Sequence, residues 1–312
     1  MTLRLARAWD AWLALWRGDE DVRHLALVRI LVGVILAGDL LWTRRLGLIE
    51  PLWGLDGVVD IAARDPMPAL WRWFGHDAAH VGWTLSFAGA VGLATGTLTR
   101  LSAVVLVLAY AQLADANTWS DRGIDTLLRN VTLVLACSPS HHVWSVDGWV
   151  ARLRGVPLPA SGPAWPRRLL ALQLVVVYAA AGLQKTALAW TPLGGFSALY
   201  IVLQDPSIAS WRFDWLADVL PLTQVATAAT MAFEWGAMLV PVAWYFERTR
   251  TRPGWWRAQS NRTGWVRGWL ATGALLHLGI AATLSLGIFP WAMLALYPVM
   301  LRPPPLRSSP AG

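Results

Sequence analysis

Residues 169–185 read LLALQLVVVYAAAGLQK, an apolar run that closes on Lys185, the only lysine in the chain. With its neighbours the run approaches the roughly 20 apolar residues that an α-helix needs to cross a bilayer. Of the 26 lysines and arginines, the other 25 are arginine, which stays charged at any accessible pH. A desolvated lysine can instead lose its proton and act as a base or nucleophile. Lys185 is a candidate for that role, although a lysine left by chance would extend its amine to the membrane surface from the same position.

The composition of the whole chain is that of a membrane protein. Apolar residues make up 56% and charged residues only 14% of the 312 residues, against about 45–50% and 25% in soluble domains. The 22 tryptophans cluster beside the apolar runs, as expected of side chains in the interfacial layer. The net charge of +7 comes from arginines in loops, where they orient the chain and contact membrane lipids, so we expect no nucleic-acid partner.

Apolar runs at helical length predict an all-α, polytopic membrane bundle of about seven to eight spans within residues 23–303. The runs are residues 25–42, 79–95, 101–115, 124–138, 168–186, 219–246, 268–288 and 291–301. Three of them, 101–115, 124–138 and 291–301, are shorter than a full span, and whether they cross completely stays open. Residues 1–22 predict an amphipathic helix on the membrane surface, and residues 304–312 predict a disordered tail.

The distribution of arginine predicts the orientation of the chain. With the N-terminus in the cytoplasm, most loop arginines fall on the cytoplasmic side, including six in residues 248–267. We therefore expect a multi-pass protein of a bacterial cytoplasmic (inner) membrane, with Lys185 toward the opposite face.

Several ionisable residues fall inside the apolar runs, where each must face protein or a wet cavity. Asp125 and Arg129 are four residues apart, a spacing that favours a helical ion pair. Alternatively, Arg129 faces a polar cavity and binds an anionic group. Arg29 and Asp39 are too far apart along one helix to pair with each other, so each needs another partner, which for Asp39 could be the interface beside Arg44 and Arg45.

Two further ionisable residues lie near the middle of later runs. Glu234 is either protonated and hydrogen-bonded, or paired across the bundle with Arg29, Arg129 or Lys185. His277 is either a satisfied core histidine or a site residue.

Motifs of soluble enzymes are missing from the sequence, which has no Gly-rich phosphate loop, GxSxG, HExxH or CxxC. His141 and His142 are adjacent, and on a regular element their rings would splay apart, which is poor spacing for metal ligands. Cys137 is the single cysteine, so we predict neither a disulfide framework nor a metal site.

Two stretches, HHVWSVDG at residues 141–148 and AGLQK at residues 181–185 followed by Trp190, stand in an order and spacing that resemble the vitamin K-dependent gamma-glutamyl carboxylase family. The membrane part of that family is the HTTM (horizontally transferred transmembrane) domain. Further similarities are LVRILVGVILAGDLLW at 27–42, DTLLRN at 125–130 and LHLGIAATLSLGIFPWAMLA at 276–295. The resemblance extends over residues 22–303.

The resemblance implies that Lys185 is the base that deprotonates reduced vitamin K or menaquinone, with His142 in a supporting role. The quinone then reacts with O2, and a proton is removed from a glutamate to which CO2 adds, so the implied activity is that of a lyase. We predict Trp144, Asp147, Arg129, Glu234 and His277 as substrate-binding residues.

The sequence departs from the family pattern in three places. Gln184 stands where the carboxylases carry another lysine, and Val143 stands where they carry an aromatic residue. The large region outside the membrane that binds the propeptide in the animal enzymes has no counterpart in residues 1–312. If every run crosses the membrane, His142 and Lys185 lie on opposite sides.

Three functional hypotheses follow. The first is a membrane enzyme that performs carboxylation, or epoxidation of the quinone, on a peptide or small acid. The second is a non-catalytic scaffold for the maturation or export of a small secreted peptide. The third is a quinone-binding or lipid-binding membrane protein without turnover.

Overall fold

The computed structural model of the chain describes all residues except 1–8, 11–12, 14–15 and 305–312. The predicted amphipathic helix and the predicted tail therefore lie in large part outside the described residues. The chain divides into two compact units, Met1–Leu170 with Arg302–Gly312, and Ala171–Leu301. The division falls within helix α9 (Trp165–Gln184).

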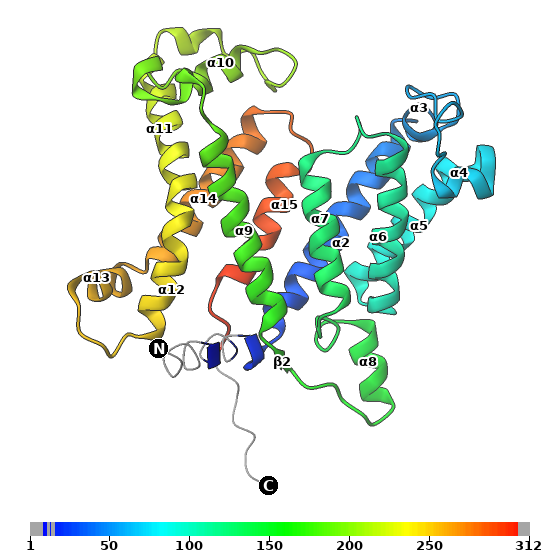
Figure 1. Cartoon of the computed structure of the whole chain (residues 1–312), viewed down its shortest axis with the longest axis horizontal. Helices are drawn as coiled ribbons and strands as arrows, with labels where there is room; N and C mark the ends of the chain where they lie inside the picture. Colours follow the sequence, from blue (N-terminus) through cyan, green and yellow to red (C-terminus); the bar gives the residue numbers. More distant parts are fainter. Residues whose placement is uncertain (1–8, 11–12, 14–15, 305–312) are drawn as a thin grey trace. The chain divides into compact units, whose positions relative to one another are not determined.

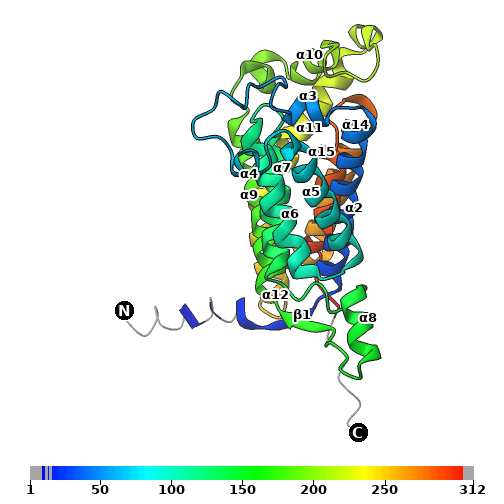
Figure 2. The ribbon, with the colours of Figure 1, turned by 90° about the vertical axis from the view of Figure 1, so that its right-hand side faces the viewer.

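The first unit is built on four long helices, α2 (Arg23–Arg45), α5 (Ala78–Thr95), α6 (Thr99–Ala116) and α7 (Gly123–Ala136). Helix α5 packs against α2 and α6, and α7 packs against α6 and α2. The short elements α3 (Ile49–Trp53), α4 (Ala69–Phe74) and η1 (Gly75–Asp77) lie toward one end of these helices, and α8 (Val146–Leu153) lies at the other end (Figures 1 and 2).

A short antiparallel ladder ties the start of the chain to the start of α9. Strand β1 (Asp19–Asp21) pairs with β2 (Ser161–Pro163), with Asp19 opposite Pro163. The buried carboxylate of Glu20 accepts hydrogen bonds from Arg167 at 2.5 and 3.0 Å and from Arg168 at 3.4 Å. Residues 19–21 thus form a strand where an amphipathic helix was predicted, because the ladder and the ion pairs fix them in extended form.

The second unit contains the remainder of α9 and a series of helices that follow it. They are η2 (Leu188–Trp190), η3 (Pro192–Gly194), α10 (Ala198–Gln204), η4 (Asp214–Ala217), α11 (Leu220–Gly236), η5 (Ala237–Leu239), α12 (Val240–Arg248), α13 (Trp255–Thr263), α14 (Trp265–Thr283), α15 (Phe289–Leu296) and η6 (Tyr297–Met300). Helix α14 packs against α11, α12 and α15, and α10 packs against α11. In Figure 1, α10 lies at one end of α11, and α13 lies beyond α12 at the other end.

The predicted all-α class is confirmed, and every predicted apolar run contains a helix. The run 219–246 is not one continuous α-helix, because the 3-10 turn η5 separates α11 from α12. Pro241, at the start of α12, has no backbone N–H to donate to the preceding turn, which explains the interruption. The run 268–288 ends early at Thr283, since Leu284 forms a bridge with Ala209 instead of continuing the helix.

Four helices among the described residues are long and apolar enough to cross a membrane, judged by length and composition. They are Arg23–Arg45, Thr99–Ala116, Trp165–Gln184 and the composite Leu220–Arg248. The run 101–115, which looked short in the sequence, is one of them because α6 extends beyond it at both ends.

Candidate functional site

The Lys185 amine is held by an ion pair in the second unit. Its Nζ atom lies 2.6 and 2.8 Å from the two carboxylate oxygens of Glu234 and 3.4 Å from the carbonyl oxygen of Ala181. The ammonium also lies 5.0 Å from the centre of the Trp190 ring, a cation–π distance. One of the predicted pairings of Glu234, that with Lys185, is confirmed. The two carboxylate oxygens of Glu234 and the carbonyl oxygen of Ala181 provide one acceptor for each of the three ammonium protons.

A glycine brings the two helices close enough for this pair to form. A Cβ atom on Gly182 would lie 2.5 Å from Cδ1 of Trp235 and 3.1 Å from Cβ of Glu234. Only glycine fits this approach of α9 to α11, and the approach sets Glu234 opposite Lys185, which directly follows the last residue of α9.

The pair is largely removed from solvent. The side chain of Lys185 is 21% exposed and that of Glu234 is 9% exposed. In such surroundings the attraction between the charges is much stronger than at a wet surface, and the loss of either partner leaves an uncompensated charge.

A buried hydrogen-bonded chain lies along the same face of α9. Tyr178 precedes Lys185 by seven residues, about two helical turns, so both side chains share one face. The Tyr178 hydroxyl lies 2.6 Å from Nε2 of His277 and 2.9 Å from the Tyr297 hydroxyl. Nδ1 of His277 is buried and has no hydrogen-bond partner among the described residues. His277 is thus satisfied at one ring nitrogen only.

Sequence reasoning missed both tyrosines of this chain. The spacing of Tyr178 from Lys185 is a signal that could have identified the first. The rings of Phe233 and Trp269 pack edge-on against Tyr178, with centroids 4.9 and 5.3 Å away. Because Phe233 immediately precedes Glu234, the helix α11 contributes to the aromatic packing and to the ion pair with adjacent residues.

In the first unit, the motif at residues 141–148 forms a turn that leads into α8. The Ser145 side chain caps α8 by accepting a hydrogen bond from the Gly148 amide at 2.9 Å, and it donates to the His141 carbonyl. Nδ1 of His142 lies 2.9 Å from the Pro159 carbonyl oxygen. Trp144 has a φ of 51°, in the left-handed region that bulky residues rarely adopt, and its ring is 55% exposed.

The two histidines of the motif do not splay apart. Because they lie in a turn instead of on a regular element, the rings of His141 and His142 meet edge to face, with centroids 4.8 Å apart. Burial, followed by the nearby His142 and Arg100, lowers the pKa of His141, so this imidazole is neutral at physiological pH.

Asp147 fastens the motif to the turn between α5 and α6. Its carboxylate accepts three hydrogen bonds of 2.8 Å, from the amides of Leu98 and Thr99 and from the Thr99 hydroxyl. Burial alone would raise the pKa of Asp147, but the hydrogen bonds from Thr99 and Leu98 together outweigh it and hold the pKa below its usual value. The adjoining Gly96 has a φ of +69°, and a Cβ atom there would collide with Ser145 and Arg29.

Arg29 anchors the same turn from inside the bundle. Its side chain is fully buried on α2 and donates to four backbone carbonyls, those of Leu93 at 2.6 Å, Ala94 at 3.2 Å, Ser140 at 3.3 Å and Trp144 at 2.6 Å. The prediction that Arg29 needs partners from outside its own span is confirmed, but these partners are carbonyls instead of a carboxylate. The signal in the sequence was an arginine inside an apolar span without an acid within reach along its helix.

The predicted ion pair between Asp125 and Arg129 is wrong. Asp125 accepts hydrogen bonds from Arg122 at 2.8 and 3.0 Å and from the Tyr110 hydroxyl at 2.9 Å. Arg129 instead makes two 2.7 Å bonds to Asp121. The reason is local: Asp125 lies in the first turn of α7, where its side chain meets the N-terminal flank of the helix, and the loop before α7 places Asp121 beside Arg129.

Asp39, the other acid of the first span, also has a partner from a distant segment. Its carboxylate accepts a 2.6 Å hydrogen bond from Arg122, which bridges α2 to the start of α7. The prediction that Asp39 needs a partner from outside its own span is therefore confirmed.

The structure separates the predicted site residues into two clusters, and Arg129 lies outside both. Lys185, Glu234 and His277 belong to the second unit. His142 and Trp144 lie in the turn before α8 and Asp147 lies in the first turn of α8, all in the first unit, where Arg129 is held on α7 by Asp121. Each cluster is complete within its own unit.

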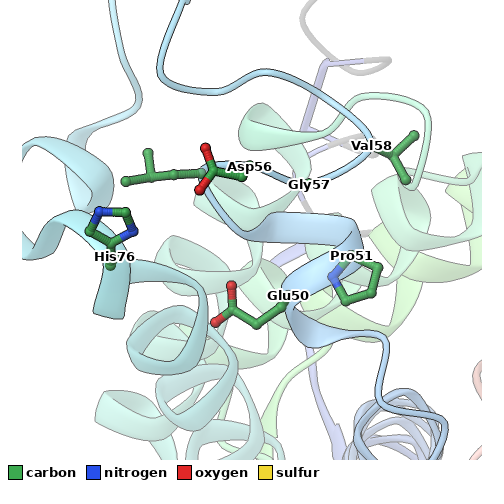
Figure 3. Close-up of a pocket in the computed structure, with 7 residues that line it drawn as sticks. Glu50, Pro51, Asp56, Gly57, Val58 and His76 are labelled. Atoms are coloured by element: carbon green, nitrogen blue, oxygen red, sulfur yellow. The ribbon is translucent and has the colours of Figure 1, made fainter.

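A surface pocket of about 560 Å³ lies elsewhere in the first unit, at the loop after α3. Its lining residues are Glu50, Pro51, Leu55, Asp56, Gly57, Val58 and His76. Figure 3 shows Glu50, Asp56 and His76 around this hollow. The Glu50 carboxylate already pairs with Nδ1 of His80 at 2.9 Å. The pocket contains none of the predicted site residues.

We predict that Asp147→Asn lowers the free energy of unfolding by about 1–2 kcal/mol, because an amide accepts through one oxygen and leaves an N–H of Leu98 or Thr99 without its partner. In the folded state the pKa of Asp147 lies below its unfolded value of about 3.9. The stability that the Asp147 carboxylate contributes is therefore fully present above about pH 3.9 and is lost as the pH falls through the pKa of the folded state. Denaturant titrations at pH 7 and below pH 4 measure both effects. Asp214→Asn is the control, since its partner Arg212 is exposed, and an equal loss in both variants would contradict the assignment.

The family model described as the HTTM domain matches residues 18–254. Of the predicted site residues, His277 lies beyond the matched segment and the others lie within it. No solved structure matches the chain.

Proposed function

The chain belongs to the HTTM domain family, and on that premise we propose that this membrane protein is an enzyme that removes a proton from a reduced quinone with Lys185 as the base. The reaction would be of the vitamin K-dependent carboxylase type, either carboxylation of a peptide or small acid or epoxidation of the quinone alone. The observation that carries the proposal is the partly desolvated ion pair of the single lysine with Glu234 beneath the ring of Trp190.

The ion pair offers a way to make a neutral amine. When one ammonium proton moves from Nζ of Lys185 to the Glu234 carboxylate 2.6 Å away, both groups become neutral and the net charge of the site stays the same. Away from water, charge separation costs more, so the neutral arrangement becomes accessible. The free amine can then accept a proton from a hydroxyl group placed beside it.

Two neighbouring groups support a flat, amphiphilic ligand. Trp190 presents an aromatic ring beside the amine, and the buried Nδ1 of His277 lies on the Tyr178 side of the same unit, ready to donate or accept a hydrogen bond. A reduced vitamin K or menaquinone, when bound, supplies the electrons that react with O2. Residues of this chain would hold the proton at Lys185 and Glu234 and keep water away from the site.

The other predicted residues have assignable roles within this proposal. For His142 and Trp144 we propose a supporting role that belongs to their own turn in the first unit. Asp147 and Arg129 are engaged in contacts of their own and would position that turn and α7. We further propose seven to eight spans and an N-terminus in the cytoplasm of a bacterium, supported by the helices in every apolar run and by the arginine-rich segment 248–267.

Lys185→Arg tests the proposal. Arginine keeps the positive charge and the pair with Glu234 but cannot act as a base at accessible pH. We expect quinone-dependent O2 consumption, or CO2 incorporation with reduced menaquinone, to fall by a factor of about 10² or more, the usual worth of a positioned base. The stability of the variant in detergent is the control for folding. Full activity in a folded Lys185→Arg protein would overturn the enzymatic proposal.

One observation favours a second candidate function, that of a non-catalytic scaffold for a small secreted peptide or a binder of quinone or lipid. All three protons of the Lys185 ammonium already have acceptors, as in a structural ion pair. Under this alternative, Lys185→Arg retains the cellular phenotype. Co-purification of a menaquinone-like lipid without turnover would then identify a binder, and co-purification of a secreted peptide would identify a scaffold.

A further inference from the structure

The helix α8 turns its apolar side away from the protein. Val146, Trp149 and Leu153 lie at positions i, i+3 and i+7 and therefore share one face of the helix. Their exposed fractions are 37%, 56% and 68%. The exposed Trp144 precedes this face and the exposed Val156 follows it. An apolar helix face of this kind needs something to cover it.

The opposite side of α8 is fixed to the bundle. Gly148 on that side is buried, and a Cβ atom there would lie 2.9 Å from the His142 carbonyl oxygen. The Asp147 amide donates to the Gly96 carbonyl at 2.9 Å, and the Asp147 carboxylate holds the amides of Leu98 and Thr99. The helix therefore cannot roll over to bury its apolar face against the first unit.

The attachment to Thr99 fixes the level of α8 in the membrane. Thr99 is the first residue of α6, whose 18 residues make it one of the candidate spans. At 1.5 Å per residue such a helix is about 27 Å long, close to the thickness of the hydrocarbon core, about 30 Å. Thr99 must then lie near the boundary between hydrocarbon and headgroups, and α8, bonded to it, lies at the same level.

The charges around the apolar face match those of a lipid surface. Arg100, Arg152 and Arg154 are exposed beside it. Arginines at the rim of an apolar face meet lipid phosphates, and tryptophan favours the interfacial layer. The exposed arginines make the surroundings of this face positive, which matches anionic lipid headgroups, and the bonds to Thr99 place the face at the headgroup level. These two observations favour lipid as the occupant.

We propose that α8 and Trp144 form an in-plane membrane anchor, with Trp149 and Leu153 inserted among the lipids of the leaflet at the N-terminal end of α6 and with Arg152 and Arg154 at the phosphates. The anchor keeps the turn at residues 141–148 at the membrane surface. This inference does not depend on any catalytic activity, so it stands or fails separately from the enzymatic proposal.

Site-directed spin labelling of the full chain in liposomes tests the anchor. Cys137 is first replaced by serine, and single cysteines are then placed at Trp149, Leu153 or Arg154, with Leu108 on α6 as the lipid-facing reference. The vesicles are made of phosphatidylcholine and phosphatidylglycerol. Collisions of the label with O2, which concentrates in lipid, are compared with collisions with a water-soluble nickel chelate.

The labels at 149 and 153 should collide more often with O2 than with the chelate, as at 108, whereas the label at 154 should show the reverse. Preference for the chelate at 149 and 153 would overturn the proposal, and so would protection from both reagents, which would indicate a protein partner. Because these positions are exposed and unpaired in the described residues, the substitutions leave the contacts of Asp147 and Ser145 in place.

Discussion

Arg29→Met should lower the free energy of unfolding by about 3–5 kcal/mol, because up to four buried carbonyls lose their donor at once and each unsatisfied group costs about 1–3 kcal/mol before relaxation. Methionine is apolar and shorter than arginine, so the loss combines the missing hydrogen bonds with the small cavity left at the position of the guanidinium group. Unfolding in mixed micelles of mild and denaturing detergent measures it.

Two further observations sharpen this prediction. Arg29→Lys should recover only part of the stability, because an ammonium has three donors at one point and cannot span the carbonyls of α5 and of the turn at residues 141–148. In Arg29→Met, amide hydrogen exchange should rise first in that turn, since Ser140 and Trp144 lose their bond to α2. A change below about 1 kcal/mol would show that the carbonyls find other donors.

Glu234→Gln should lower the free energy of unfolding by about 2–3 kcal/mol, somewhat less than the 3–5 kcal/mol expected for a fully buried pair, since the Lys185 side chain keeps 21% exposure. Stability is lost because the partly buried ammonium of Lys185 remains without a carboxylate partner. The same detergent titration measures it.

The matched control is the double variant Lys185→Gln, Glu234→Gln. Removal of both charges should restore most of the stability, because two neutral side chains of similar size carry no desolvation penalty for an unpaired charge. A double-mutant cycle then gives a coupling energy of about 2 kcal/mol between the two residues. Simple additivity of the two single variants would show that the residues do not interact in the folded protein.

Much of the fold follows from the sequence because helix formation in a membrane is set by local apolar length. Each apolar run contains a helix, and the interruption of run 219–246 at η5 follows from Pro241, whereas the early end of α14 at Thr283 depends on the bridge between Leu284 and the distant Ala209. The strand at residues 19–21 could not be predicted, since it depends on pairing with residues 161–163, which are distant in the sequence.

The partners of charged residues were predicted less well, because they depend on which distant segments pack together. Arg129 was expected to pair at helical spacing, but a loop that folds back beside α7 supplied Asp121 instead. For Glu234 the sequence could offer only a set of cations, because the choice among them depends on which helices pack together. Gly182 makes that choice by letting α11 approach α9, and its significance becomes apparent only in three dimensions.

Surface turns are ordinarily the places where a protein tolerates sequence change, but the turn at Gly96 is an exception. Any side chain at this position would have to displace both Ser145 and Arg29 and adopt a left-handed backbone. Substitution of Gly96 should therefore be as damaging as a change in the centre of the bundle.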